Sequence, residues 1–301
     1  MNYFPTRILL ATDGSEDAAV ATRAAMDIAN RSGSELHVMH AFEFIPPREY
    51  MNVALRLHSP SDFAGQGQRL LDEQVRRVEE AGGNVAGAHL RMGSPVDQIL
   101  YASEELEAGL VVVGRRGLGG VKRLLMGSVS EGVVHHVRRP ALVLRSAEDI
   151  WPPSHVIMAD DSSDDARKAA ELVASIGGLF GASGSLVQVY PGLLKPSGAN
   201  GSPESRMVEQ ALRQAEEDLQ SRARELEKHL GSRPEVRLVV DEGDEGIALT
   251  ILEEAQNQGV PTLISVGSRG LGRIGRVRVG SVSTKVVRAA DGPVLVHPRE
   301  A

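Results

Sequence analysis

The sequence predicts an α/β protein made of two related domains, each with a five-stranded parallel sheet and helices on both faces. Three observations carry this prediction. The chain has 301 residues, which corresponds to about two domains. Short aliphatic runs alternate with amphipathic stretches, as they do in βαβ units. Aromatic residues make up only 3%, so Val, Ile, Leu and Ala must build the core, and that composition suits strands buried on both faces.

The chain repeats itself, which predicts a tandem of two copies. Residues 110–144 resemble residues 263–297 at a constant separation of 153, and residues 7–15 (RILLATDGS) resemble residues 155–163 (HVIMADDSS) at a separation of 148. Residues 93–100 resemble residues 243–250 at a separation of 150, so the second copy holds about five more residues in its middle, a drift that loops absorb. Polar residues and two prolines mark the join near 146–153. We therefore predict domains at 1–147 and 153–301.

The elements of the first copy follow from its apolar runs and its start and stop signals. Ser15 is a helix N-cap, Gly82-Gly83 ends a helix, and Pro95 lies in the first turn of another. The predicted strands are 8–11, 36–41, 85–90, 110–113 and 141–144, and the predicted helices are 15–31, 62–81, 95–107 and 128–137. In the second copy we expect strands near 155–159, 185–190, 235–240, 262–266 and 294–297.

Composition excludes several functional classes. The chain has no cysteine, so it has no disulfide framework and no cysteine-ligated metal site. No apolar run reaches the roughly 18 residues of a spanning helix, and the first residues do not resemble a signal peptide, so we expect a cytoplasmic protein without a membrane partner. A net charge of −7 and few aromatic residues argue against a broad nucleic-acid surface.

A glycine-serine motif follows the fourth strand of each copy. It reads G-x-x-G, nine residues, then G-S: Gly114, Gly117, Gly127 and Ser128 in the first copy, and Gly267, Gly270, Gly280 and Ser281 in the second. Glycines that turn at positive φ bring the backbone close to a ligand, and the free N–H groups of the following helix attract anions. The hydroxyls of Ser128 and Ser130 add donors. The motif predicts phosphate binding; the alternative is a solvated glycine-rich turn.

Cations accompany the motif in both copies, although the protein is acidic. They are Arg115, Arg116, Lys122 and Arg123 in the first copy, and Arg269, Arg273, Arg276 and Arg278 in the second. Ligands of such sheets bind past the carboxyl ends of the strands, where strand order reverses. Asp13 ends the first strand and Gly114 ends the fourth, so we expect both to face one crevice.

The first-strand D-G-S, the G-x-P segment and the glycine-serine motif together resemble the universal stress protein family, over nearly the whole chain and twice. The resemblance implies a flavodoxin-like fold with strand order 3-2-1-4-5 and, in the ATP-binding branch, a nucleotide held by these glycines and serines. It implies that Asp13 contacts the ribose and that the backbone at Ala41 contacts the adenine. The nucleotide-binding residues implied by motif and resemblance are Ala11, Asp13, Ala41, Val113, Gly114, Arg115, Gly117, Gly127, Ser128, Val129 and Ser130, and in the second copy Ala159, Asp161, Val189, Val266, Gly267, Ser268, Gly270, Gly280, Ser281, Val282 and Ser283.

This chain departs from the family pattern at two places. Arg115 replaces the more usual small residue after the first glycine. In the second copy, Asp160 precedes Asp161 and puts negative charge near the phosphate site. The first site therefore fits the pattern better than the second.

Other motifs give weaker predictions. Residues 270–275 (GLGRIG) match a dinucleotide fingerprint but follow the fourth strand instead of the first, and no P-loop is present. The pairs His135 and His136, and His37 and His40, are poorly spaced for a metal site or for catalysis. The charge-rich helix at 204–230 has the pattern of a solvated face.

We therefore expect a non-enzymatic, ATP-binding regulator of stress adaptation, with no catalytic or metal-ligating residue. Two alternatives remain: an ATP hydrolase or nucleotidyl transferase, and an interaction scaffold that binds no nucleotide. Mg²⁺ is expected only through the nucleotide, because a ribose hydrogen bond is the favoured role of Asp13. The last strands, 141–144 and 294–296, are apolar edges, so we expect the two copies to form an internal pseudo-dimer. The resemblance further implies that whole chains form homodimers.

Overall fold

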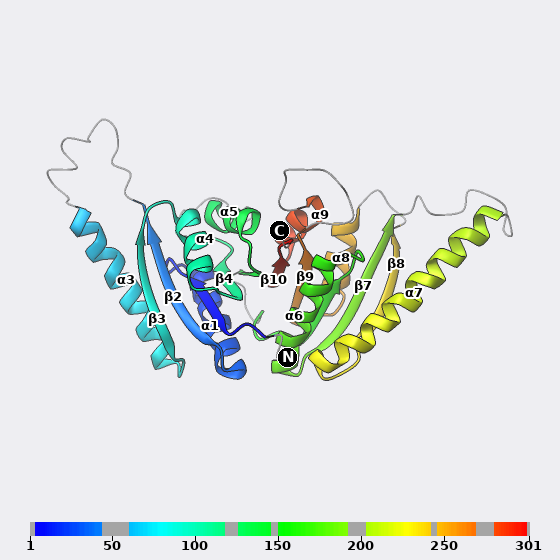
Figure 1. Ribbon diagram of the computed structural model, residues 1–301, viewed down its shortest axis with the longest axis horizontal. Helices are drawn as coiled ribbons and strands as arrows, with labels where there is room; N and C mark the ends of the chain where they lie inside the picture. Colours follow the sequence, from blue (N-terminus) through cyan, green and yellow to red (C-terminus); the bar gives the residue numbers. More distant parts are fainter. Residues whose placement is uncertain are drawn as a thin grey trace, which may run out of the picture. The chain divides into compact units, whose positions relative to one another are not determined.

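The computed structural model describes residues 4–43, 60–117, 126–145, 150–191, 203–241, 246–268 and 280–299. The chain divides into two compact units, Met1–Glu148 and Asp149–Ala301 (Figure 1). Each unit contains a parallel sheet with helices on both faces, which confirms the predicted fold class.

The first unit has the strand order β3-β2-β1-β4-β5. Its elements along the chain are β1 (Arg7–Ala11), α1 (Glu16–Ser32), β2 (Glu35–Phe42), α3 (Pro60–Glu80), β3 (Val85–Met92), α4 (Pro95–Glu105), β4 (Leu110–Gly114), α5 (Ser128–His136) and β5 (Ala141–Leu144). Helices α1 and α3 pack on one face of the sheet, and α4 and α5 pack on the other.

The second unit repeats this order as β8-β7-β6-β9-β10. Its elements are β6 (His155–Ala159), α6 (Asp164–Phe180), β7 (Ser183–Pro191), α7 (Pro203–Leu230), β8 (Glu235–Asp241), α8 (Ile247–Gln256), β9 (Thr262–Gly267), α9 (Ser281–Ala289) and β10 (Val294–His297). Figure 1 shows the long helix α7 running beside β7 and β8.

Local sequence explains where the first helix of each unit begins and ends. The Ser15 side chain accepts a hydrogen bond from the Ala18 N–H and caps α1, which ends at Gly33 with φ 75°. Ser163 caps α6 through the Ala166 N–H in the same way, and Gly181 ends that helix with φ 68°. The two copies therefore use the same start and stop signals.

The core is aliphatic, as the composition predicts. Strand β1 buries Ile8, Leu9 and Leu10 completely, and β4 buries all of Leu110–Val113. At the start of the second unit, Trp151 is 6% exposed and meets the Phe180 ring edge-on at 5.2 Å between ring centroids. No helix in the described ranges is long and apolar enough to cross a membrane.

The topology brings the ends of three strands together in each unit. Ala11, the last residue of β1, is in register with Met39 of β2 on one side and with Val113 of β4 on the other. The chain leaves β1 for α1 and leaves β4 for α5, and these helices lie on opposite faces of the sheet. Strand order therefore reverses between β1 and β4, which is where ligands of open parallel sheets bind.

Candidate functional site

Asp13 and Gly117 lie against each other at the tips of β1 and β4. The Asp13 Oδ1 accepts a hydrogen bond of 3.0 Å from the Ser15 N–H. A methyl group added at Gly117 would overlap the Asp13 Oδ2, so the loop after β4 passes directly over this carboxylate. The structure thus brings together the two ends that the sequence predicts to share one crevice.

The loop after β4 is fastened to the first turn of α1. The Ser15 hydroxyl donates to the Arg116 carbonyl oxygen at 3.0 Å, and the Arg116 N–H donates to Asp17 Oδ2 at 2.9 Å. The absence of a side chain at Gly114 permits this approach, because a methyl group there would lie 2.7 Å from the Ala18 nitrogen. Gly114 is therefore required for packing between β4 and α1.

The motif glycines correct the expectation of positive-φ turns, because none of those that the structure describes has a positive φ: Gly114, Gly117, Gly127, Gly267 and Gly280. Gly127 has φ −70° and Gly280 has φ −71°, which any residue can adopt. The Gly127 N–H donates to the Arg115 carbonyl oxygen at 2.9 Å. A methyl group at Gly127 would lie 3.2 Å from that same oxygen. The Gly127 N–H therefore closes the loop, where the motif predicted a donor to phosphate.

The start of α5 keeps its donors available. Among the described residues, the N–H groups of Ser128 and Val129 have no acceptor, and no side chain caps the helix. Ser128 is exposed. Ser130 differs from the expectation, because it is buried and its hydroxyl lies 2.6 Å from the Arg115 carbonyl oxygen, to which it donates. Ser130 thus holds the loop in place, while the N–H groups of Ser128 and Val129 belong to the open first turn of α5.

The cations of the motif that the structure describes give the site less exposed positive charge than the sequence predicts. Arg115 is 4% exposed, so its side chain is buried and does not form a surface cation. Arg116 is half-buried. The other expected cations, together with Gly270, lie outside the described residues: Lys122, Arg123, Arg269, Arg273, Arg276 and Arg278.

The tip of β2 lies beside the tip of β1. The Thr12 N–H donates to the Met39 carbonyl oxygen at 3.0 Å, and His40 Nδ1 lies 2.8 Å from the Thr12 carbonyl oxygen. Ala41 follows directly and is half-buried. The backbone at Ala41 is therefore close in the fold to Asp13. His40, for which the sequence analysis predicts no role, connects the two strand ends.

The remaining residues that the sequence predicts at the nucleotide site differ in how far their side chains are buried. Val113 and Val266 are each 3% exposed and Ala159 is 8% exposed, so these side chains belong to the core. Ala11 and Val189 are half-buried at their strand ends. Only the backbone of the three buried residues is in a position to line a site.

The second unit repeats the main contacts. The Asp161 Oδ1 accepts a hydrogen bond of 3.0 Å from the Ser163 N–H. A methyl group at Gly267 would lie 2.8 Å from the Ala166 nitrogen. The Ser283 hydroxyl donates to the Gly267 carbonyl oxygen at 2.6 Å. At the start of α9, Ser281 is exposed and Val282 is half-buried, like Ser128 and Val129 in α5.

Ser268 occupies the position of Arg115 and changes the contacts there. Its hydroxyl lies 3.4 Å from Asp165 Oδ2, and its oxygen accepts a 2.9 Å hydrogen bond from the Arg299 N–H. Burial raises the pKa of Asp165, and the Ser268 hydrogen bond acts in the opposite direction. Ser268 therefore joins the end of β9 to α6 and to the segment after β10.

Asp160 does not leave a bare negative charge beside the second site. Its carboxylate forms an ion pair with Arg222 of α7, and the two side chains are 3% and 20% exposed. The prediction of a solvated face at 204–230 is therefore wrong at Arg222. The internal repeat could have predicted this pair. Arg222 lies 148 residues after Gln74, and Asp160 lies 148 residues after Thr12, so the two positions correspond in the two copies.

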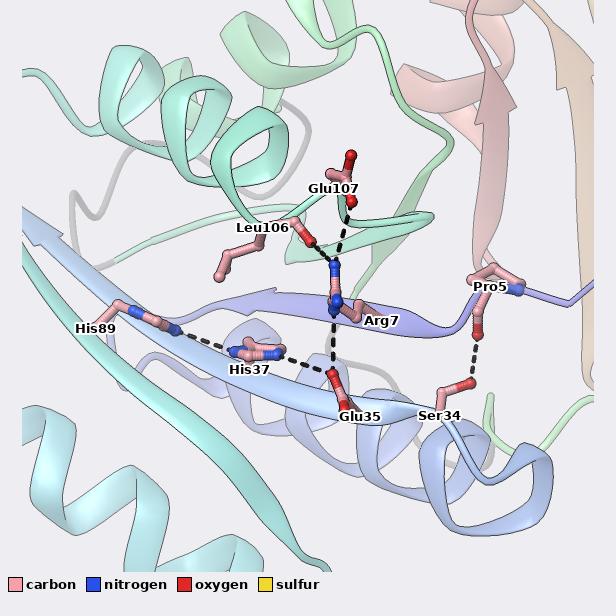
Figure 2. Close-up of polar contacts among 8 residues, drawn as sticks. All are labelled: Pro5, Arg7, Ser34, Glu35, His37, His89, Leu106 and Glu107. Atoms are coloured by element: carbon pink, nitrogen blue, oxygen red, sulfur yellow. Dashed lines mark hydrogen bonds and ion pairs between the residues drawn. The ribbon is translucent and has the colours of Figure 1, made fainter.

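A second polar cluster lies near the starts of the strands of the first unit. His37 Nδ1 lies 3.1 Å from His89 Nε2, and His37 Nε2 lies 3.8 Å from Glu35 Oε2. Arg7 also belongs to this cluster, because it forms ion pairs with Glu35 and with Glu107 (Figure 2). Within the described ranges, no three His, Cys, Asp or Glu side chains are grouped to hold a metal ion.

Comparisons with known proteins agree with this architecture. A universal stress protein of Thermus aquaticus is 34% identical over 143 residues, which are 46% of this chain and 97% of that protein. A universal stress protein of Mycobacterium tuberculosis is 33% identical over 141 residues, 46% of this chain and 45% of its own length.

Solved structures extend the likeness to the whole chain. A universal stress protein of Archaeoglobus fulgidus has the same fold, with a TM-score of 0.66 at 23% identity, and covers 98% of this chain and 99% of its own. A universal stress protein solved in complex with cAMP matches 48% of this chain and 99% of its own at 24% identity, with a TM-score of 0.38. The sequence model of the Universal stress protein family matches twice, at residues 5–145 and 153–298, so this chain is a tandem member of that family.

Proposed function

We propose that the chain is a non-enzymatic regulator in stress adaptation that binds ATP at the tips of β1 and β4. The supporting observation is the start of α5, where the N–H groups of Ser128 and Val129 have no acceptor among the described residues. The loop that leads toward it passes over Asp13 through Gly117. A site with anion-binding donors on one side and a carboxylate on the other suits a ligand that carries both phosphates and hydroxyls.

Each part of the site has a role in this proposal. The first turn of α5 and the Ser128 hydroxyl bind phosphate oxygens, Asp13 accepts from the ribose hydroxyls, and the backbone at Ala41 meets the adenine. Mg²⁺ arrives bound to the phosphates. The second unit offers the same arrangement through Asp161, Val189 and the start of α9.

The proposal of a non-enzymatic role rests on how the nearby carboxylates are used. Asp17 accepts from the Arg116 N–H and Asp13 accepts from the Ser15 N–H, so both hold the backbone in place. No described side chain at the site forms a pair of nucleophile and base within hydrogen-bonding distance.

The direct test is mass analysis of the ligand released from freshly purified protein. ATP is expected from the natural chain and not from the Gly127→Ala/Gly280→Ala variant, because a methyl group at Gly127 would lie 3.2 Å from the Arg115 carbonyl oxygen of the loop and the variant makes the same change in the second copy. ATP at about 100 times its dissociation constant is expected to stabilise the chain by about 2.7 kcal/mol. Unchanged melting with ATP and with cyclic AMP would favour a nucleotide-free scaffold. Steady ADP or AMP release that is lost with Ser128→Ala would favour an enzyme.

Assembly and location are further parts of the proposal. The last strand of each repeat is an apolar edge by sequence, so we propose that the repeats pair as a pseudo-dimer. We propose from the family membership that whole chains form homodimers in the cytoplasm. Sedimentation of the purified chain at several concentrations tests the homodimer. A single monomeric species at all concentrations would exclude it.

A further inference from the structure

The two units differ in one buried polar pair behind the tip of the first strand. In the first unit the pair is Thr12 and Gln74, which are 5% and 3% exposed. In the second unit the residues at the same separation are Asp160 and Arg222. A neutral pair has thus been replaced, at both members, by an ion pair.

The neutral pair closes a turn that contains a glycine. The Thr12 Oγ1 accepts a hydrogen bond of 3.2 Å from the Gly14 N–H, and the same oxygen lies 3.5 Å from the Gln74 Oε1. Gly14 has φ 78°, a conformation that glycine adopts without strain. The first unit therefore forms this turn without a charge.

The ion pair closes the same turn around a serine. The Asp160 Oδ1 accepts a hydrogen bond of 2.6 Å from the Ser162 N–H, and its Oδ2 is paired with the Arg222 guanidinium. Ser162 has φ 68°, which is strained for a residue with a side chain. The stronger acceptor is placed where the turn needs more support, because a carboxylate binds an N–H group more strongly than a hydroxyl does.

The turn fixes the residue that the proposed site uses. Asp161 lies between Asp160 and Ser162, and its Oδ1 accepts from the Ser163 N–H. The Gln188 amide donates to the Ser162 hydroxyl at 3.5 Å, so β7 also contacts the turn. A change in the Asp160 carboxylate would move the peptide on which Asp161 is carried.

We infer that Arg222 is a positioning residue of the second nucleotide site: it neutralises the buried Asp160 carboxylate, which holds the Ser162 turn and thereby presents Asp161 to the ligand. This inference rests on the proposed ATP binding. It assigns a role to the helix face that the sequence pattern marked as solvated. Arg222 itself is not assigned a contact with the nucleotide.

The experiment isolates the second site in the full-length chain. Gly117→Val blocks the first site, because its side chain would overlap the Asp13 carboxylate. In that background, calorimetric titration with ATP compares Arg222→Gln, Arg222→Lys and the double variant Asp160→Thr/Arg222→Gln. The double variant rebuilds the neutral pair of the first unit.

The ATP affinity expected of each variant depends on whether the charge of Asp160 is paired by residue 222. Arg222→Gln weakens ATP binding by about tenfold or more, since it leaves a carboxylate buried without its cation. Arg222→Lys binds within about threefold of the parent, because it keeps the charge paired. The double variant binds more tightly than Arg222→Gln and more weakly than the parent, because it leaves no unpaired charge but supports the Ser162 turn with a hydroxyl in place of a carboxylate. Binding by Arg222→Gln equal to that of the parent, or a double variant that is as weak as Arg222→Gln or unfolded, would overturn the inference.

Thermal unfolding of the same proteins without nucleotide separates this inference from the proposed function. Arg222→Gln is expected to melt below the double variant. If the natural chain binds no ATP, the proposed function fails, and the order of the melting temperatures still reports whether Arg222 stabilises the Asp160 turn. If the natural chain binds ATP and the Gly117→Val parent does not, the proposed function stands for the first site and the inference about the second site is overturned. A double variant that melts at or below Arg222→Gln would show that it does not.

Discussion

Gly114 shows why the first glycine of the motif has no side chain. Its Cα approaches the first turn of α1 so closely that a methyl group would lie 2.7 Å from the Ala18 nitrogen and 2.8 Å from the Asp17 carbonyl carbon. Those neighbours are backbone atoms at the start of a helix, and they cannot move aside without shifting it. The glycine therefore serves packing first, and any ligand second.

Gly114→Ala is expected to lower the free energy of unfolding by about 1–3 kcal/mol, because the added methyl overlaps the backbone of α1. Urea unfolding measures this change. The matched control is Gly65→Ala in α3, where nothing lies within 4 Å of the added methyl. That variant is expected to be more stable by about 0.5–1 kcal/mol, since alanine favours the helix interior. Equal effects at the two positions would refute the packing role.

Variants of Ser128 and Ser130 test whether Ser128 binds the nucleotide and Ser130 holds the loop after β4. Ser130→Ala is expected to destabilise the chain by about 0.5–1.5 kcal/mol, because the Arg115 carbonyl oxygen loses its hydroxyl donor and keeps the Gly127 N–H. Ser128→Ala is expected to leave urea unfolding nearly unchanged and to weaken ATP binding. The opposite pattern would mean that the roles are exchanged.

At the scale of elements, the first helix of each unit has a serine cap with an unequal number of contacts. Ser163 caps α6 through the Ala166 N–H. Ser15 caps α1 in the same way, and its hydroxyl also donates to the Arg116 carbonyl oxygen of the loop after β4. The cap of α1 therefore also joins two elements.

Ser163→Ala is expected to cost about 0.5–2 kcal/mol of stability as the loss of a cap, and Ser15→Ala is expected to cost more. The difference measures the contact between α1 and the loop. Denaturant unfolding of the two variants under one condition gives both values. A Ser15 variant no less stable than the Ser163 variant would indicate that the loop contact adds nothing.

The sequence predicts elements better than it predicts contacts. Alternating aliphatic runs, Ser15 and the glycine pair after α3 are local signals, and they place strands and helices to within a few residues of the observed ones. The burial of Arg115 and the pairing of Arg222 with Asp160 depend on which helix packs over which strand end. A helical charge pattern alone cannot separate a solvated arginine from one that turns inward. The expected Gly270 and its neighbouring cations lie outside the described residues, and their roles stay predictions.

At the scale of the whole molecule, buried histidines link stability to pH. Burial lowers the pKa of His89 from its ordinary value of 6.5, and the charges of His37 and Arg91 act in the same direction, while Glu105 opposes them. Burial also lowers the pKa of His155, where Glu235 opposes it. In each case the unfolded chain takes up a proton more readily than the folded chain does.

The free energy of unfolding is therefore expected to be largest above about pH 6.5 and to decrease as the pH falls below it. Urea midpoints at neutral pH and at about pH 5.5 measure the decrease. His89→Gln is expected to show a smaller decrease than the natural chain. Midpoints that stay constant or rise on acidification would contradict this assignment.

The packing of Trp151 against Phe180 has a spectroscopic consequence. Trp151 is the only tryptophan of the chain, and it lies in the second unit. Its indole emission therefore reports on the surroundings of Trp151 and Phe180 in the second unit, without any label. A tryptophan placed in the first half of a Trp151→Phe chain would supply the complementary probe, so the melting of each repeat can be followed separately in an otherwise intact polypeptide.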